Sequence, residues 1–276
     1  MASCLYCRSN GPFGTEDHVI PESLGNDDLI LREQVCDCCQ AYFGKEIERY
    51  VLEKTPIGVW RVMLGIPTKK GKLPSINTAQ PLGEKGIIPE CHAQHDNVGF
   101  TAHPDGTTSV DIGDDAALQG ILSGRKTAIN LILSPKKLQM LGRFLAKVAL
   151  GIIAIGDDCR ARDRRFDPIR RYARYGEFEG LWPLFSYIEG TVGEGRRPVL
   201  VGPTGETVLE EVCLYSYAFV EVAGTYTLFR FSMGVDNWVV CLDDPYPPPI
   251  IRSAFPSREL KLVWYAPEEW KTDNRG

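Results

Sequence analysis

The pattern of apolar and polar residues near the start of the chain predicts a short hairpin followed by helices. Residues 16–20 and 29–31 have the composition of two strands, and the segment 24–28, with its Gly, Asn and Asp, is typical of a loop. Apolar side chains then recur at helical spacing from residue 40 to residue 52. A second short helix is predicted over residues 56–64, so the order is strand, strand, helix, helix.

Two further helices are indicated by the residues that begin them. Ser134 and Pro135 combine an N-terminal cap with proline at the first helical position, and apolar residues recur at helical spacing up to Gly156. This helix is expected to lie in the core. Asp167 and the proline after it can open another helix.

The C-terminal part of the chain alternates in the way that is typical of a half-buried antiparallel sheet. Aromatic residues occupy every second position in several stretches, and glycine-containing turns separate them. An aromatic binding face is an alternative use of this pattern, although core packing is the simpler interpretation. The predicted strands are residues 127–133, 208–222, 225–233, 238–242 and 260–265.

These patterns predict an α+β protein, and a length of 276 residues suggests two domains. We expect an N-terminal module over residues 1–65 and a linker with Gly, Pro and Lys over residues 66–83. A mixed α+β domain with an antiparallel sheet, whose role is not evident from its residues, would follow over residues 84–276.

Composition narrows the range of partners. The chain is 43% hydrophobic, which is ample for a core, and it has a formal net charge of -5. An acidic chain is not a general nucleic-acid binder, so contact with DNA needs a local basic surface or a bound metal ion. Because the sequence contains no apolar signal segment and no long apolar run free of charge, we expect a cytoplasmic protein with no membrane partner.

The cysteines favour metal binding. Nine cysteines, an odd number, argue for reduced thiols over a set of disulfides. Cys4 and Cys7 form one C-x2-C pair, and Cys36 and Cys39 form a second. Four thiolates in two such pairs can hold a structural Zn2+. Cys38 could replace Cys39 in that site, but the spacing favours Cys39.

Asp17 and His18 lie between the two cysteine pairs. An acidic residue next to a histidine can ligate a hard metal ion and accept a proton near neutral pH. Alone, a four-cysteine cluster is typical of a zinc ribbon, and an acidic residue beside a histidine is typical of a surface ion pair. Their combination favours a catalytic site.

In this order the motifs resemble the HNH endonucleases, or ββα-metal nucleases, and within them the zinc-stapled subgroup. That pattern has a C-x2-C pair, an Asp-His or Glu-His pair, and a second C-x2-C pair followed at once by Asn, where this chain has Gln40. The stretches 17–25 (DHVIPESLG) and 43–48 (FGKEIE) also resemble a bacterial HNH subfamily. The resemblance covers about the first quarter of the chain.

The resemblance implies a metal-dependent endonuclease that cleaves DNA to leave a 5′ phosphate and a 3′ hydroxyl. His18 would be the general base, and Asp17 and Gln40 would hold one Mg2+ or another divalent cation such as Mn2+ or Ni2+. Gln40 is one methylene longer than Asn, which could alter the metal geometry. Asn26 would orient His18, and Glu16 could assist or replace Asp17.

Two basic stretches are candidates for contact with the phosphates of DNA. One is the predicted linker with Lys69, Lys70 and Lys72, which could equally be a solvated loop. The other is an arginine-rich segment with interleaved aromatic residues, which could instead be a solvated helix paired with neighbouring aspartates. Its candidate residues are Arg164, Arg165, Arg170, Arg171 and Arg174.

A cluster of Cys91, His92 and His95, with His103 nearby, could form an accessory metal site, although a polar loop is the simpler interpretation. Two alternatives to a DNA endonuclease stay open for the chain. One is a catalytically decayed, zinc-stabilised module that binds nucleic acid or protein, and the other is an HNH nuclease that acts on RNA. Because unregulated cleavage is toxic, the family also implies control by the second domain or a partner protein, as in restriction or anti-phage defence.

Overall fold

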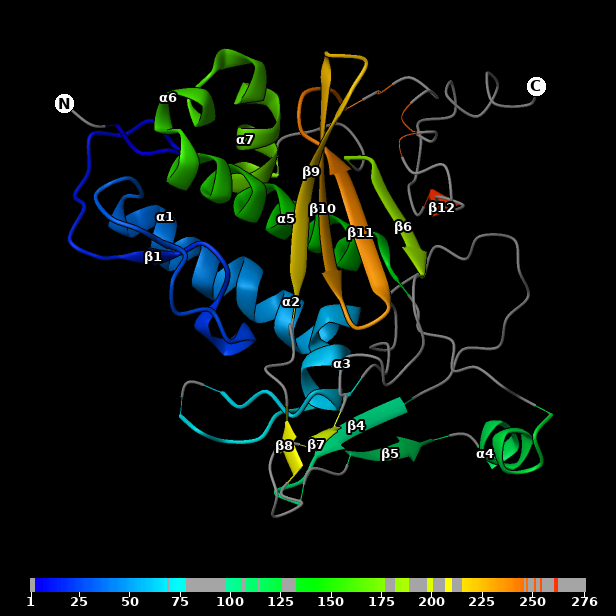
Figure 1. The fold of residues 1–276 in the computed structure, drawn as a ribbon. Helices are drawn as coiled ribbons and strands as arrows, with labels where there is room; N and C mark the ends of the chain where they lie inside the picture. The colour runs from blue at the N-terminus through cyan, green and yellow to red at the C-terminus, as the bar shows by residue number, and fades with distance from the viewer. Residues whose placement is uncertain are drawn as a thin grey trace, which may run out of the picture.

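The computed structural model describes most of the chain and has an α+β fold, as predicted. All strand pairs within the described residues are antiparallel. Figure 1 shows an N-terminal module in blue, helices α5 to α7 in green and a sheet in yellow and orange. The described residues are 3–68, 70–77, 98–105, 108–113, 115–125, 133–176, 182–188, 198–200, 207–209, 215–245, 247, 251, 254 and 261–262.

The N-terminal module has the predicted hairpin and helices. The helix that follows the hairpin begins after Cys36 and runs to residue 54, with a π-helical segment in its middle. The elements are β1 (Asp17–His18), the 3-10 turn η1 (Glu22–Leu24), β2 (Ile30–Leu31), α1 (Asp37–Tyr42), the π-helix η2 (Phe43–Glu48), α2 (Arg49–Lys54) and α3 (Pro56–Met63).

The long helix α5 (Pro135–Gly156) begins as predicted. The Ser134 side chain accepts a hydrogen bond from the backbone N–H of Lys137, and Pro135 takes the first helical position. By length and composition α5 could cross a membrane, but 78% of its apolar window is buried inside the protein, which is the behaviour of a core helix. It is followed by α6 (Asp158–Ala161), the 3-10 turn η3 (Arg164–Phe166) and α7 (Asp167–Tyr175).

The largest sheet has the strand order β12-β6-β11-β10-β9 and contains most of the strands predicted near the C-terminus. Its strands are β6 (Leu184–Ile188), β9 (Ser216–Val222), β10 (Tyr226–Met233), β11 (Asp236–Cys241) and β12 (Lys261–Leu262). The remaining elements are β3 (Ser75–Asn77), β4 (Val98–Ala102), β5 (Thr108–Ile112), α4 (Asp115–Leu122), β7 (Pro198–Leu200) and β8 (Thr207–Leu209). Of the predicted strand 127–133, residues 127–132 lie outside the described residues.

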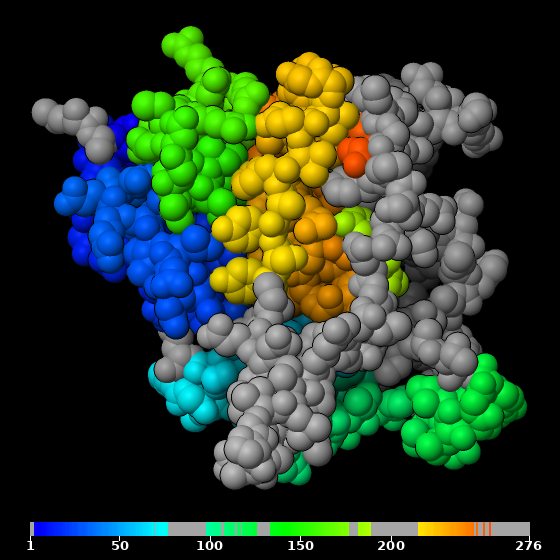
Figure 2. Space-filling model, viewed as in Figure 1, coloured from blue at the N-terminus to red at the C-terminus, as the bar shows by residue number. Residues whose placement is uncertain are grey.

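The hydrophobic core does not divide at the expected linker. One cluster of buried side chains joins Phe43 of η2 to Phe144 of α5 and Phe231 of β10. The rings of Phe144 and Phe231 meet edge to face with their centroids 6.0 Å apart. In Figure 2 the blue module, the green helices and the yellow and orange strands form one continuous surface. The expected boundary at 66–83 is therefore not a boundary of the core, because a module this small buries its apolar face against its neighbours.

The turn between β10 and β11 packs against α3. Trp60 donates its Nε1–H to Oδ2 of Asp236 at 2.7 Å. A Cβ atom on Gly234 would lie 2.3 Å from the Trp60 ring, and Gly234 has a φ of +60°. Both the close approach and the left-handed backbone therefore require glycine at this position.

We predict that Gly234→Ala lowers the free energy of unfolding by about 2–4 kcal/mol, because overpacking adds to backbone strain. Gly224→Ala is the matched control, since Gly224 has a φ of +66° but no atom within 4 Å of a new Cβ. It should show the strain alone, about 1–2 kcal/mol. Urea unfolding of both variants measures the difference, and equal losses would contradict the packing against Trp60.

Candidate metal centre and active site

The two cysteine pairs meet at one point beside the start of α1. The Sγ atoms of Cys4, Cys7, Cys36 and Cys39 all lie within 4.8 Å of one another. A tetrahedral Zn2+ with Zn–S bonds of about 2.3 Å holds its sulfur ligands roughly 3.8 Å apart, so the cluster has the dimensions of a zinc site. Cys38 is exposed and lies outside the cluster. The choice of Cys39 is confirmed.

Backbone and side-chain donors hold the cysteine pairs together. The N–H of Leu5 donates to the carbonyl of Gln34 at 2.8 Å, and the N–H of Cys36 lies 3.4 Å from Sγ of Cys4. The guanidinium Nε of Arg174 lies 3.1 Å from Sγ of Cys39. Donors and positive charge near the sulfur atoms favour the thiolate form that binds zinc.

Three of the four candidate catalytic residues line one pocket of about 510 Å³, and the fourth, Asn26, does not. Asp17 and His18 come from β1, and Gln40 comes from α1, directly after the second cysteine pair. The structure adds Glu22 from η1 and Glu48 from the π-helical segment. The fold therefore brings together the three residues that the sequence suggests for the reaction.

His18 is held through one of its two ring nitrogens. Its Nε2 lies 2.8 Å from Oε1 of Glu22, whereas Nδ1 is buried and has no hydrogen-bond partner among the residues that the structure describes. If Nε2 carries the proton and donates to Glu22, Nδ1 keeps a lone pair that can accept a proton. This arrangement suits a general base oriented by a carboxylate.

Asp17 pairs with a lysine from α5. Lys147 Nζ lies 3.1 Å from Oδ2 of Asp17 and 3.0 Å from Oε1 of Glu48. It also donates to the carbonyls of His18 at 2.5 Å and Val19 at 3.0 Å. Burial opposes the charge of Lys147, but the two carboxylates more than offset it and raise the pKa of this lysine, so the ammonium is retained. Burial raises the pKa of Asp17.

The oxygen donors in the pocket fit a hard divalent cation. Asp17, Glu48 and Gln40 offer carboxylate and carboxamide oxygens, the ligands that Mg2+ prefers. Apart from its ion pair with Lys147, Oδ2 of Asp17 is buried without a hydrogen-bond partner in the described part of the chain. Two carboxylates against one ammonium also leave a net negative charge that attracts a cation.

Comparison with known proteins identifies this segment. A protein-family model described as HNH endonuclease matches residues 4–55, the range that contains both cysteine pairs and the carboxylates and histidine of the pocket. This segment is an HNH endonuclease domain. No curated protein and no solved structure matches the chain. The resemblance stated from the motifs is confirmed, and it supports nuclease activity on nucleic acid at the level of the family.

Three side chains of the HNH site are absent from the set suggested by the sequence. Glu22 and Glu48 lie within the family-like stretches 17–25 and 43–48, and their place in these stretches is the signal that could have identified them. Lys147 lies 129 residues after His18. Its only signal is a charge on the buried face of an apolar helix.

Asn26 acts on the loop backbone and not on the histidine ring, so its expected role needs correction. Its Nδ2 donates to the carbonyl of Ile20 at 2.7 Å, and its Oδ1 accepts the N–H of Leu29 at 3.0 Å. Asn26 is buried and closes the loop of the hairpin, while Glu22 holds the ring. Glu16, considered as a substitute for Asp17, forms an exposed salt bridge and does not line the pocket.

Two arginines expected to contact phosphate are used inside the fold. Arg170 is buried, pairs with Asp167 and donates to the carbonyl of Ala161 at 2.6 Å, and burial lowers its pKa to about 10. Arg174 lies over the ring of Tyr42, 4.0 Å from its centroid, in addition to its contact with the zinc-site sulfur. Arg170 is therefore not available to DNA, whereas Arg174 is half-buried and its contact with DNA stays a prediction.

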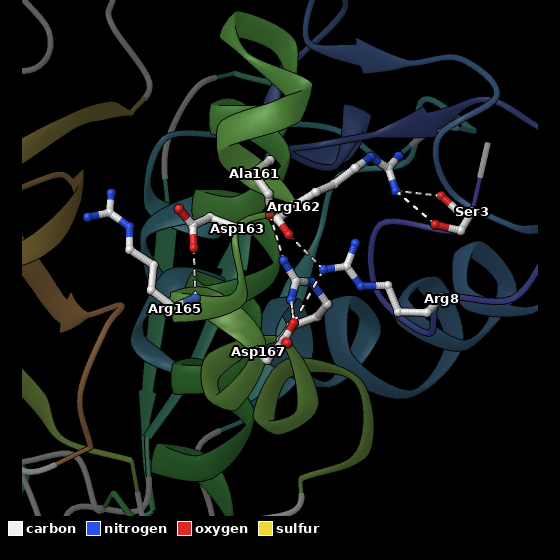
Figure 3. A network of polar contacts seen from close by, with 8 residues as sticks. Ser3, Arg8, Ala161, Arg162, Asp163, Arg165 and Asp167 are labelled. Carbon is white, nitrogen blue, oxygen red and sulfur yellow. Dashed lines mark hydrogen bonds and ion pairs between the residues drawn. The ribbon is translucent and has the colours of Figure 1, made fainter. Parts of the chain in front are cut away.

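Other arginines fasten the first cysteine pair to α6 and α7 (Figure 3). Arg8 donates to the carbonyl of Arg162 at 2.9 Å, and Arg162 donates to the carbonyl of Ser3 at 2.6 Å. Arg165 points to the other side and lies 3.5 Å from a carboxylate oxygen of Asp243. Arg164 and Arg171 are exposed. Several arginines of the segment therefore hold the fold together, a role that neither interpretation of the sequence included.

Two of the linker lysines, Lys70 and Lys72, line the pocket beside the candidate catalytic residues. Their contact with phosphate stays a prediction. Lys69 lies outside the described residues, as do Cys91, His92 and His95 of the suggested accessory site. The fourth member of that cluster, His103, is half-buried and bonded to Ser109.

We predict that Cys39→Ser loses most of the bound zinc and unfolds the N-terminal module, because structural zinc contributes directly to folding. Cys38→Ser, one residue away and exposed, is the matched control and should keep the metal. Elemental analysis of zinc per chain and thermal unfolding of each variant test this. Loss of zinc from Cys38→Ser instead would assign the fourth ligand to Cys38.

Proposed function

We propose that this protein is an endonuclease that hydrolyses phosphodiester bonds of DNA through its HNH domain, with His18 as the general base. The observation that carries the proposal is the state of the His18 ring. Glu22 holds Nε2 at 2.8 Å, and Nδ1 is left without a partner among the described residues, in a pocket with the Asp17 carboxylate. A base held in one tautomer beside a cation site is what hydrolysis by an activated water needs.

His18 would take the proton of the attacking water on Nδ1. As the imidazolium forms, the Glu22 carboxylate stabilises its charge through the 2.8 Å contact. Lys147 holds the carbonyl of His18 and the next carbonyl, so the backbone that carries the base is fixed in place. A base that is already held in position lowers the entropic cost of reaching the transition state.

Asp17, Gln40 and Glu48 would hold the divalent cation of an HNH nuclease, such as Mg2+. When bound there, the cation supplies counter-charge to the phosphate and stabilises the departing 3′ oxygen. Gln40 presents its carboxamide oxygen in the place of the usual Asn. The pocket also contains Glu48, which can supply an oxygen ligand if the longer side chain of Gln40 changes the geometry.

Lys70 and Lys72 would receive the phosphate backbone. Both are exposed at the pocket, and neither forms an ion pair with any residue that the structure describes. In a chain with a net charge of -5, this local basic edge and the cation are the features that attract DNA. Restriction or anti-phage defence is the regulated setting that we propose for such an activity, in a reducing compartment such as the cytoplasm.

The test is cleavage of plasmid and linear DNA by the zinc-loaded protein with Mg2+, Mn2+ or EDTA. We expect metal-dependent cutting that falls about 100- to 10,000-fold in His18→Ala, the range for loss of a general base. His103→Ala is the matched control, because His103 does not line the pocket, and it should cut at the normal rate.

Other outcomes separate the alternative functions. Cutting of RNA but not of DNA would indicate an RNA nuclease. Binding of nucleic acid without cutting by the wild-type protein under any metal would indicate a decayed site, and Gln40→Asn would then test whether Gln40 is the cause. Equal cutting by wild type and His18→Ala would contradict the assignment of the base.

We predict that the double variant Lys70→Ala/Lys72→Ala weakens DNA binding for all sequences and lowers the salt dependence of binding. Removing two phosphate contacts should reduce the slope of log K against log salt by roughly 1.8. Arg164→Ala, an exposed arginine outside the pocket, should leave the slope unchanged. Fluorescence anisotropy over a salt series measures both, and the reverse pattern would place the DNA surface on the arginine-rich segment.

A further inference from the structure

The positively charged group buried beside the HNH pocket is the ammonium of Lys147, and this residue lies outside the segment that matches the family. Lys147 lies on α5, more than 90 residues beyond the end of the family match at residue 55. Its Nζ has four oxygen atoms at 3.1 Å or less, two from carboxylates and two from backbone carbonyls. Such a shell of oxygens resembles the surroundings of a bound hard cation.

The position of Lys147 against the hairpin is fixed on both sides. The Tyr6 hydroxyl, from the first cysteine pair, donates to the Lys147 carbonyl at 2.9 Å. One helical turn after Lys147, a Cβ atom on Gly151 would lie 2.7 Å from Cγ1 of Val19, so α5 approaches the hairpin closely. The ammonium therefore reaches the site from a rigid helix and not from a mobile loop.

The ammonium also determines the charge of the metal-binding group. The carboxylates of Asp17 and Glu48 both contact Nζ of Lys147 and together carry two negative charges. The ammonium of Lys147 reduces the net charge of this group to -1. Without the lysine, the two carboxylates would repel each other and attract a divalent cation more strongly. With it, both carboxylates and the carbonyl of His18 have a fixed common partner.

We propose that Lys147 is a positioning residue of the nuclease site, which orients Asp17, Glu48 and the backbone of His18 and limits how tightly the site holds a divalent cation. This inference rests on the proposed function. A salt bridge with only a structural role would change the fraction of folded protein. A positioning role also changes the properties of the molecules that remain folded.

The experiment compares Lys147→Met with the wild-type protein in two measurements. The first is Mn2+ affinity, from electron paramagnetic resonance of the zinc-loaded protein without nucleic acid, and the second is cleavage at saturating Mn2+. We expect Mn2+ to bind at least about tenfold tighter, because a nearby positive charge is lost. We expect cleavage to fall about 100-fold, because the base and the carboxylate lose their common anchor. Unfolding would lower both Mn2+ affinity and the rate of cleavage, so it cannot produce tighter Mn2+ binding together with slower cleavage.

Two controls anchor these measurements. Lys136→Met removes an exposed lysine from the same helix and should change neither quantity. Asp17→Asn should weaken Mn2+ binding, which assigns the signal to this site. A Mn2+ affinity that responds to neither Asp17 nor Lys147 would place the ion elsewhere and overturn the proposal, as would wild-type values for both measurements in Lys147→Met.

A double variant covers the case in which Lys147→Met does not fold. Removing one partner of a buried ion pair is far more damaging than removing both. Glu48→Gln/Lys147→Met is therefore compared with Glu48→Gln alone, and the loss of Lys147 should again tighten Mn2+ and slow cleavage. Equal Mn2+ affinity and equal cleavage in that comparison would overturn the proposal.

The two proposals can fail separately. If the wild-type protein cuts no nucleic acid under any metal, the proposed function fails, and the Mn2+ measurement still decides whether Lys147 limits cation binding. If the wild-type protein cuts and Lys147→Met matches it in both measurements, only the role of Lys147 fails.

Discussion

A hairpin with strands of two residues cannot hold a catalytic site in place by itself. Isolated hairpins are marginal in water, and β1 and β2 contribute only two facing residue pairs. The hairpin is held from two sides, by the four-cysteine cluster and by α5. The ammonium of Lys147 links α5 to the hairpin beside the candidate site, because it bonds the backbone of β1 and the Asp17 and Glu48 carboxylates.

The same constraint accounts for the shared core. An HNH domain with a zinc cluster has little apolar surface of its own, so Phe43 and its neighbours pack against α5, and α5 packs against the sheet. The sheet reaches back to the N-terminal region through the contact of Trp60 with the turn that carries Gly234. The residues after the family match thus form part of the structure that supports the site, and a change in them can be transmitted to it.

The net charge of this protein, -5, does not describe the charge at its pocket, where basic side chains are gathered. The chain is acidic, and in its most arginine-rich segment Arg162 and Arg174 contact the cysteine pairs, while Arg8 reaches the same segment from the first pair. The pocket is lined by four basic residues, Arg49, Arg61, Lys70 and Lys72, together with its carboxylates. A negatively charged substrate would be drawn to this edge by lysines and a bound cation, and repelled by most of the remaining surface.

The sequence by itself determined the local features, because these depend on the spacing of a few residues. The C-x2-C pairs predicted the four-cysteine cluster, Asp17 and His18 predicted the position of the candidate site, and Ser134 with Pro135 predicted the start of α5. Periodicity also predicted the strands around Phe231. Each of these features is encoded within one or two turns of chain, where cap, turn and ligand rules apply directly.

Only the tertiary structure decided which distant groups share a site. Lys147 reads in the sequence as one charge on an apolar helix, and it contacts two carboxylates that line the pocket because α5 lies against β1. Arg170 and Arg174 read as a phosphate-binding face. In the structure Arg170 is buried and bonded to the carbonyl of Ala161, and Arg174 contacts Sγ of Cys39. Long-range packing sets these roles, since the free energy of a buried charge depends on the partners that the fold brings to it, and no local spacing specifies those partners.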